Sequence, residues 1–383
     1  MQTRQQPTPD AYMKNSEMNR RSLLKAASLA AVGAIVGPSC VAPVVPNPAL
    51  GTPRKLAKVN VSWDRLIRTV VGLRPTREGG FRVEAEKFDS KTVIHNYGHD
   101  SKGVTLSWGT AHLAVEEAVK TGHVRYAVIG CGAVGLATAR LLQRRGYDVT
   151  IYAKDLPPDT TSNIGLGMWG PVRDDPNAPP EYREKFARAA RFSHRYFQDL
   201  VGDYYGVRWT EWYSGGGATR LARLKDDPFR NLYVDLQELG EKEHPFPAVS
   251  VLRWLGIQIE PPIYLNALMR DFQLAGGRII VREFPDLRSL LTLPEPVVMN
   301  CTGLGARSLF GDQKLFPTKG QLMVLPPQPE VDYMADIVHD MVSRKDGVLL
   351  GGRSEPNVWT LEPNEEARRR SMAEHIEFFR AMR

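Results

Sequence analysis

The stretch RYAVIGCGAVGLATA, residues 125–139, decides the fold of this chain. Its apolar beginning leads into three spaced glycines, Gly130, Gly132 and Gly135, and helix-forming residues follow. In such a unit the first glycine permits a tight turn, the second lets the backbone approach a phosphate, and the third lets the helix pack against the strand. The free N–H groups and dipole of the helix N-terminus would then hold the phosphates. The stretch therefore predicts a dinucleotide site.

A second apolar run strengthens this interpretation. Residues 148–152 read as a strand that arrives after the predicted helix, as a βαβ unit requires. A structural glycine turn is the alternative, because a GxGxxG pattern by itself is weakly specific. The order of elements favours an α/β fold.

Composition narrows the class of protein. The 383 residues exceed one typical domain, and 42% hydrophobic with 24% charged residues favours a folded core over disorder. The net charge of +7 comes from scattered basic residues such as Arg144, Arg145 and those at 368–370. Because no basic stretch alternates with aromatic residues, we expect no nucleic-acid partner and interpret the charge as solvated helix faces that also attract anionic substrates.

Three cysteines, Cys40, Cys131 and Cys301, form neither a disulfide framework nor a pair with metal-ligand spacing. We therefore expect no metal site.

The N-terminus is typical of an export signal. Residues 19–25, NRRSLLK, precede a short apolar run at 26–36, which together indicate the twin-arginine route. That run is shorter than the ~20 residues of a bilayer-spanning helix. We therefore expect a periplasmic or secreted protein that is cleaved near Ala42 or anchored through a lipid on Cys40. The proline-rich run at 41–53 reads as a linker, so residues 1–57 are assigned to signal and linker.

Periodicity and turn residues predict the remaining elements. We expect strands at 81–84, 92–96, 278–284, 296–301, 319–324 and 347–352, and helices at 110–119, 181–200, 264–276 and 365–382.

Five motifs together resemble the D-amino-acid oxidase family of FAD-dependent oxidoreductases. They are VIGCGAVG at 128–135, VTIYA at 149–153, TTS at 160–162 with GMW at 167–169, VMNCTG at 298–303, and VIHNYGH at 93–99 followed by GVT at 103–105. The resemblance covers most of residues 65–383. It implies an FAD cofactor, a Rossmann-like FAD-binding domain and an α+β substrate domain with a mixed or antiparallel sheet.

The resemblance also implies a domain division and an altered chain order. Residues 77–170 and 257–312 are assigned to the FAD-binding domain, and residues 58–76, 171–256 and 313–383 to the substrate domain. In the family the Arg-Pro segment and the NYGH strand close the chain, whereas here they precede the glycine turn. The chain therefore looks like a circular permutant.

Site residues follow from the resemblance one by one. Arg74 matches the arginine that pairs bidentately with the substrate carboxylate, a geometry that lysine cannot copy; an inter-domain salt bridge is the alternative. The backbone run at 103–105 matches the one at the flavin's pyrimidine edge. The cofactor residues implied are Gly130, Gly132, Ala133, Val134, Gly135, Lys154, Asp155, Thr160, Thr161, Ser162, Gly167, Met168, Phe284, Thr302, Gly103, Val104 and Thr105.

The chain departs from the family pattern in three segments. Lys154 stands where an acidic residue would hold the adenosine ribose, with Asp155 one place on. Asp100 and Ser101 replace the glycines that usually follow His99. The segment HDM at 339–341 occupies the place of a tyrosine that helps to hold the carboxylate, so we expect a substrate with a cation for Asp340 to pair with; a solvated loop charge is the alternative.

Function follows as an expectation. The sequence predicts an exported FAD-dependent oxidase that moves a hydride from a D-amino acid or related amine to flavin N5, gives an imine and then a keto acid, and uses oxygen. Two alternatives stay open: a flavin-binding module without turnover, and a dehydrogenase that passes electrons to a quinone or other carrier. NAD(P) is the weaker choice of cofactor. His95, His99 and Cys301 are expected to be structural, Trp169 either flanks the flavin or packs in the core, and the oligomeric state is left open.

Overall fold

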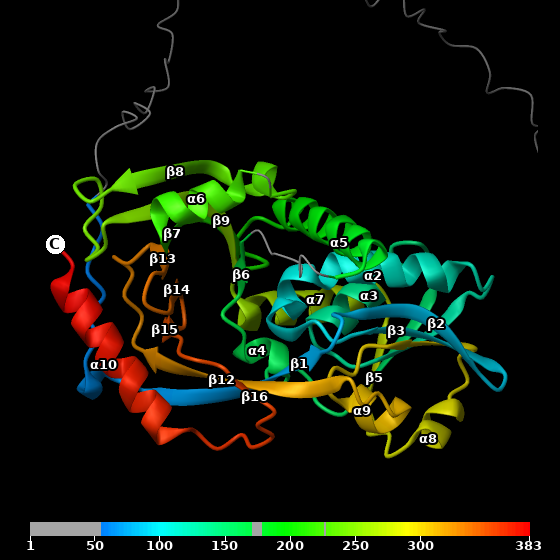
Figure 1. Cartoon of the computed structure of the whole chain (residues 1–383). Helices are drawn as coiled ribbons and strands as arrows, with labels where there is room; N and C mark the ends of the chain where they lie inside the picture. Colours follow the sequence, from blue (N-terminus) through cyan, green and yellow to red (C-terminus); the bar gives the residue numbers. More distant parts are fainter. Residues whose placement is uncertain (1–54, 171–177, 226) are drawn as a thin grey trace, which may run out of the picture. The chain divides into compact units, whose positions relative to one another are not determined.

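The computed structural model describes residues 55–170, 178–225 and 227–383 (Figure 1). The predicted export signal and most of the linker lie outside these residues. The described chain forms two β-sheets with helices packed on both. In this part of the chain no helix has the length and apolar character needed to cross a membrane.

The smaller sheet has six strands in the order β10-β5-β4-β11-β3-β2. All its pairs are parallel except the hairpin between β2 and β3. Its strands are β2 (Arg82–Phe88), β3 (Lys91–Tyr97), β4 (Arg125–Ile129), β5 (Asp148–Ala153), β10 (Arg278–Val281) and β11 (Val297–Asn300). A mostly parallel sheet needs cover on both faces, because crossover helices lie above and below it.

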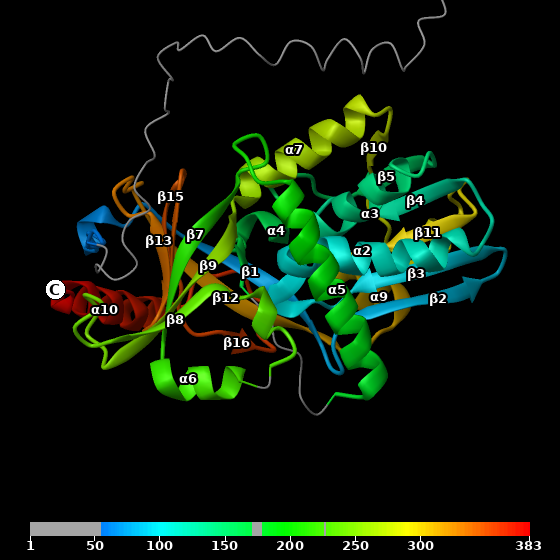
Figure 2. The same cartoon turned by 90° about the horizontal axis from the view of Figure 1, so that it is seen from above.

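Helices cover each face of this sheet, and the side-chain alternation of β4 shows why. Tyr126 and Val128 point into a core shared with α2 (Gly103–Val119), α3 (Ala133–Gln143), α5 (Pro180–Asp199) and α7 (Pro261–Leu274) (Figure 2). Ala127 and Ile129 point to the other face, where α8 (Leu287–Leu291) and α9 (Gly305–Phe310) pack. Successive residues of a strand face opposite sides of the sheet, so a strand made only of apolar residues is buried on both faces.

The larger sheet has ten strands, with the path β1-β12-β15-β14-β13-β7-β9-β6; β16 pairs with β12 and β8 with β9. Its pairs are antiparallel except β13 with β7. Its strands are β1 (Arg68–Arg77), β6 (Met168–Trp169), β7 (Val207–Gly215), β8 (Val234–Gly240), β9 (Ser250–Ile259), β12 (Leu315–Leu325), β13 (Tyr333–Asp336), β14 (Asp340–Arg344), β15 (Gly347–Leu350) and β16 (Glu355–Pro356). This mixed sheet and the parallel one confirm the predicted fold class.

One face of the larger sheet is covered by the C-terminal helix α10 (Glu365–Ala381). Met372, Phe378 and Phe379 of this helix join a buried cluster with Met323 of β12 and Met341 of β14. The other face carries α4 (Thr161–Ile164) near β1 and α6 (Gly217–Leu224) near β9. Residues that alternate with the buried methionines therefore point toward the space between the two sheets.

Several predicted boundaries were wrong, and one error affects the site. The helix expected at 110–119 begins seven residues earlier, at Gly103. Gly109 lies inside this helix, at the point where α2 crosses α5. A side chain does not fit there, because a Cβ would lie 1.9 Å from the carbonyl oxygen of Ala189. The strand expected at 278–284 ends at Val281, and the one at 319–324 extends over Leu315–Leu325. The domain division stays a prediction; its boundary at residue 257 falls within β9.

Candidate functional site

One cavity of about 840 Å³ brings together every residue that the sequence analysis assigned to cofactor or substrate. Arg74 on β1 and the run at 103–105 on α2 line it together with the glycine turn that follows β4. Cofactor and ligand sites of roughly 300–1,000 Å³ are usual. Segments that are far apart in the sequence therefore line the same cavity.

The glycine turn has the shape that a diphosphate requires. Gly130 has φ +109°, and a Cβ there would lie 2.5 Å from the carbonyl oxygen of Cys301. A Cβ on Gly135 would lie 2.0 Å from the carbonyl oxygen of Gly130, so no larger residue allows this approach of helix and turn. Gly132 caps α3 without a side chain, which leaves the helix N-terminus open to a ligand.

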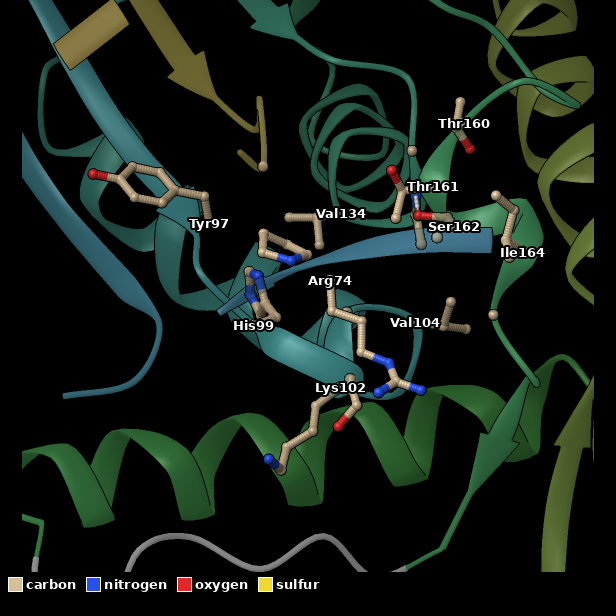
Figure 3. A pocket seen from close by; sticks show the side chains of 18 of the residues that line it. Arg74, Tyr97, His99, Lys102, Val104, Val134, Thr160, Thr161, Ser162 and Ile164 are labelled. Carbon is tan, nitrogen blue, oxygen red and sulfur yellow. Dashed lines mark hydrogen bonds between the residues drawn. The ribbon is translucent and has the colours of Figure 1, made fainter. Parts of the chain in front are cut away.

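The short helix α4 lies beside that N-terminus. The hydroxyl of Ser162 accepts a hydrogen bond of 3.0 Å from the Ala133 N–H, the first residue of α3. Thr160 directly precedes α4, and its hydroxyl donates to Asn163 Oδ1 at 2.7 Å. Figure 3 shows Thr161 and Ser162 approaching the cavity from the start of α4, while Arg74 points into it from β1. Hydroxyl groups and backbone N–H groups are suitable donors for phosphate oxygens.

A second helix N-terminus faces the same cavity. Gly103, Val104 and Thr105 form the first turn of α2, so their N–H groups lack partners within the helix. The Thr105 hydroxyl donates to the Met168 carbonyl at 2.9 Å and fixes this turn beside β6. Trp169 donates to the Thr105 carbonyl at 3.0 Å and is 1% exposed. Of the two alternatives for Trp169, packing in the core rather than flanking the flavin therefore agrees with the structure.

Arg74 lies over a glycine on the neighbouring strand. A Cβ on Gly320 of β12 would lie 2.8 Å from an Arg74 guanidinium nitrogen. The guanidinium donates to the Ser354 hydroxyl at 2.5 Å. Glycine at 320 thus gives the guanidinium room to lie flat across β12, with its remaining donors available to a carboxylate.

Electrostatics distinguish the titratable groups of the cavity. Burial raises the pKa of Asp340 to about 6, and the nearby Asp336 also raises it. Burial lowers the pKa of His99 to about 3 and that of His95 to about 4, so both are neutral at pH 7. Burial raises the pKa of the Cys301 thiol to about 12. These shifts disfavour acid–base work by the two histidines and Cys301 at pH 7, whereas the pKa of Asp340, among the described groups that line the cavity, is raised toward neutrality.

Charged residues line the end of the cavity near β5 and β10. Lys154 pairs with Glu283 at 2.9 Å, and both side chains are exposed. Arg282 lies over the ring of Phe284 at 4.7 Å. Sequence reasoning missed Glu283 and Arg282, although both follow β10 directly and lie beside Phe284, which it did identify. Glu283 supplies a carboxylate near the place where Lys154 stands.

The opposite end contains residues that no motif marked. Arg220 of α6, Trp212 of β7 and Trp254 of β9 line the cavity. The two indole rings stack with centroids 5.0 Å apart. They come from a polar, aromatic segment with no recognisable pattern, and only the pairing of β7 with β9, Trp212 opposite Trp254, brings them together.

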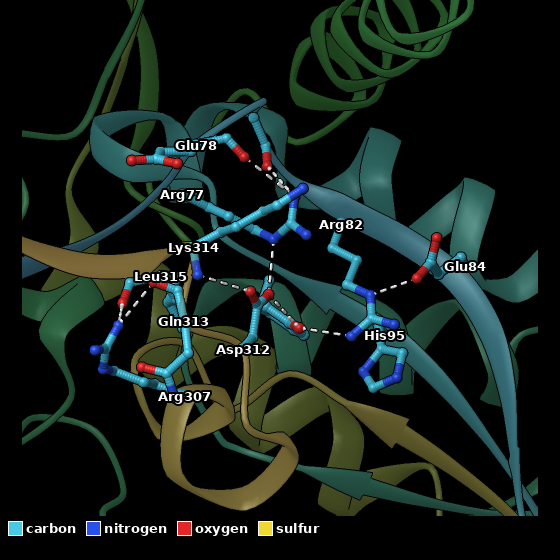
Figure 4. Close-up of polar contacts among 12 residues, drawn as sticks. Arg77, Glu78, Arg82, Glu84, His95, Arg307, Asp312, Gln313, Lys314 and Leu315 are labelled. Atoms are coloured by element: carbon cyan, nitrogen blue, oxygen red, sulfur yellow. Dashed lines mark hydrogen bonds and ion pairs between the residues drawn. The ribbon is translucent and has the colours of Figure 1, made fainter.

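A polar network joins β1 to the small sheet (Figure 4). Asp312 accepts hydrogen bonds of 2.8 Å from Arg77 Nε and from the Tyr97 hydroxyl. Thr76 donates to Asp100 Oδ1 at 2.8 Å, and Asp100 has φ +52°. The turn after His99 is therefore held by Asp100 in place of a glycine. The network fixes Arg74 relative to the first turn of α2.

Comparisons with known proteins agree with this geometry. The family model described as FAD dependent oxidoreductase (DAO) matches residues 125–382. The chain is 30% identical over 246 residues to a D-amino-acid oxidase of Rubrobacter xylanophilus, covering 63% of this chain and 72% of that protein. It is 27% identical over 259 residues to a D-amino-acid oxidase of Dictyostelium discoideum, covering 62% and 68% respectively.

A solved structure supports the fold. Glycine oxidase from Bacillus cereus superposes with a TM-score of 0.53 at 15% identity, covering 68% of this chain and 79% of that one. The glycine turn, the two helix N-termini and the single cavity fit a flavin dinucleotide, which confirms FAD as the cofactor. With the family model matching most of the described residues, the chain belongs to the FAD dependent oxidoreductase family.

Proposed function

We propose that this protein oxidises a D-amino acid or a related amine to the imine and that molecular oxygen is the electron acceptor. The observation that carries the proposal is the meeting of Arg74, the first turn of α2 and the glycine turn in one cavity. An arginine in such a place suits a carboxylate-bearing substrate. Two relatives of this chain are named D-amino-acid oxidase, which supports the choice of substrate class.

The chain's own groups have distinct tasks in this reaction. Arg74 binds the substrate carboxylate in a bidentate manner and so fixes the Cα hydrogen in one direction. FAD, when bound, supplies the acceptor for the hydride that leaves Cα. The first turn of α2 presents N–H groups and the positive end of a helix dipole, which stabilise the negative charge that develops on reduction. Water then hydrolyses the imine to a keto acid and ammonia.

Substrate positioning supplies most of the acceleration in this proposal. Holding two reacting groups in the right geometry is worth about 7–11 kcal/mol. Trp212 and Trp254, which are 8% and 1% exposed, line the same cavity as Arg74, and their indole rings would help to exclude water from it.

The order of segments supports circular permutation, which we also propose. The family model matches residues 125–382, while β1 and β3, with Arg74 and the NYGH run, lie before that region. Helix α2 ends at Val119 and β4 begins at Arg125, so a short connection joins the segment that resembles the family's C-terminus to the segment that resembles its N-terminus.

We further propose export by the twin-arginine route. The paired Arg20 and Arg21 and the apolar run at 26–36 support this. The mass of the exported form will separate cleavage near Ala42 from a lipid on Cys40.

The test uses the FAD-loaded full chain and a panel of D- and L-amino acids and simple amines. We expect anaerobic bleaching of the flavin by one or more D-amino acids, and peroxide formation when oxygen is admitted. Bleaching without peroxide would replace oxygen by a quinone or another carrier. A flavin that no member of the panel bleaches would make the protein a binding module and refute the proposal.

A further inference from the structure

Asp340 and Arg74 lie on the same face of the larger sheet. Met323, Met341 and Leu350 share one register row and are buried on the α10 side. Asp340 precedes Met341 and therefore points to the opposite side, toward the cavity that it lines. Arg74 points to the same side. Gly72 and its register partner Gly320 both line the cavity, and residues two apart on a strand face the same side, so Arg74 faces the cavity as Gly72 does.

Two further charged groups lie at this end of the cavity, and they neutralise each other. Arg220 approaches Asp336 Oδ2 at 3.5 Å and also donates to the Ser214 hydroxyl. Asp336 is the register partner of both Asp340 and Ser214, which places the pair next to Asp340 on the sheet. Arg220 additionally lies 5.9 Å from the Trp254 ring centroid.

Arg74 and Asp340 make no ion pair with any other residue in the described part of the chain. Arg74 has the Ser354 hydroxyl as a polar partner, and the backbone carbonyl of Asp340 accepts from Gly351 N–H at 2.7 Å, which leaves both charges available. One free cation and one free anion on a single face match the two charges of an amino-acid zwitterion. An anionic substrate side chain that approached Arg220 would have to break the pair of Arg220 with Asp336.

We propose that Asp340 binds the α-ammonium of the substrate while Arg74 holds its α-carboxylate, and that Asp340 then accepts a proton from that ammonium. The inference rests on the proposed function and names a catalytic base for it. It also replaces the expectation of a cationic substrate side chain, because the cation that Asp340 needs is the ammonium itself.

The proton transfer balances without a further reactant. One N–H bond of the ammonium breaks, its electron pair stays on nitrogen, and an O–H bond forms on the Asp340 carboxylate. The amine is now neutral, and its lone pair supports the departure of the Cα hydrogen as a hydride. After the product leaves, the Asp340 proton returns to water.

The surroundings of Asp340 suit this task. Burial and, as a smaller contribution, Asp336 on β13 raise its pKa to about 6. Arg74 on β1, the adjacent His339 and Arg220 on α6 oppose that increase. His339 itself pairs with Glu374 of α10 at 2.6 Å. Asp340 is therefore mostly ionised at pH 7, yet it is a stronger base than an ordinary aspartate, and a base with a pKa near the working pH is the most effective one.

The first test measures flavin reduction by D-alanine anaerobically between pH 5 and 8, in FAD-loaded wild type and in Asp340→Asn. For wild type we expect the second-order rate constant to fall about tenfold per pH unit below pH 6. Asp340→Asn should lose that acidic limb and be at least about 100-fold slower at pH 7. Asp340→Glu should restore the limb in part, since it keeps a carboxylate.

Asp336→Asn is the matched control. It removes a neighbouring carboxylate that raises the pKa of Asp340, so the acidic limb should persist and move to lower pH, while the plateau rate falls far less than in Asp340→Asn. A limb that is identical in wild type and in Asp340→Asn would overturn the inference while leaving the proposed function intact. A wild-type flavin that no D-amino acid reduces would overturn the proposed function and the inference with it.

A binding measurement gives a readout that does not depend on turnover. Propanoate has the carboxylate of D-alanine but no ammonium, and its binding changes the flavin absorbance. We expect propanoate to bind at least about tenfold more tightly to Asp340→Asn than to wild type at pH 8, because it no longer faces an ionised carboxylate. Equal affinities would contradict the placement of Asp340 beside the substrate. Loss of rate with D-lysine but not D-alanine in Asp340→Asn would assign Asp340 to a side-chain cation instead.

Discussion

Gly320→Ala should impair catalysis without impairing the fold. The added Cβ would lie 2.8 and 3.0 Å from two atoms of the Arg74 guanidinium, and its three nearest neighbours are all guanidinium atoms. Ordinary contact begins at 3.4 Å, so the guanidinium must retreat by about 0.6 Å. Gly320 lies inside β12, where alanine is normally more stable than glycine by about 0.5–1 kcal/mol. Because the displaced group is the tip of a flexible side chain, stability should stay level or rise.

The cost appears in substrate positioning. A misplacement of about 1 Å in an active site can lower the rate by ~10²-fold. For a shift of about 0.6 Å we expect kcat/KM for a D-amino acid to fall about 10- to 100-fold, which corresponds to about 1.4–2.7 kcal/mol. FAD content should not change, because Gly320 is not part of the glycine turn and the atoms displaced are those of Arg74.

The assay compares kcat/KM, melting temperature and FAD content of Gly320→Ala with wild type and with Gly215→Ala. Gly215 ends β7 in the same sheet, and a Cβ there would find neighbours only at 3.5 Å. The control should therefore behave as wild type in all three measurements. An unchanged kcat/KM in Gly320→Ala would refute the assignment of Arg74 as the group that holds the carboxylate.

Two further substitutions test other parts of the site. Gly135→Ala places a Cβ 2.0 Å from the Gly130 carbonyl oxygen, a backbone atom that cannot move aside, so we expect the purified variant to retain little FAD, measured by flavin absorbance per chain; full FAD content would contradict the phosphate-binding turn. Asp312→Asn removes the carboxylate that accepts from Arg77 and Tyr97, and we expect about 1–3 kcal/mol lower unfolding free energy at pH 7 by denaturant titration. Burial tends to raise the pKa of Asp312, but the hydrogen bonds from Arg77 and Tyr97 lower it below its ordinary value. The stabilisation by the Asp312 carboxylate is therefore present above the pKa of the unfolded state, and the difference in unfolding free energy between wild type and Asp312→Asn should shrink below about pH 4. A difference that does not depend on pH would contradict the ion pair.

Local signals predicted the nucleotide half of the site. The glycines at 130, 132 and 135 could be identified from a single sequence, because the close approach of backbone segments at these positions leaves no room for a side chain. Strands β4 and β5 were found for a similar reason, since a doubly buried strand reads as a continuous apolar run.

The substrate half could be predicted only in part, because sheet register creates it. Arg74 was identified by resemblance, but its seat over Gly320 depends on the pairing of β1 with β12, which lie far apart in the chain. Arg220 and Trp254 carry no local pattern and reach the cavity through α6 and β9. The predicted start of α2 was wrong because glycine and threonine are weak helix formers, whereas packing against α5 stabilises the helix from Gly103 onward.

The most direct test of the central claim is the absorbance of the purified full chain before and after anaerobic addition of D-alanine and, separately, L-alanine. The account predicts a yellow protein with one FAD per chain whose flavin bands are bleached by the D-enantiomer and remain with the L-enantiomer. A colourless protein that does not take up added FAD would contradict it.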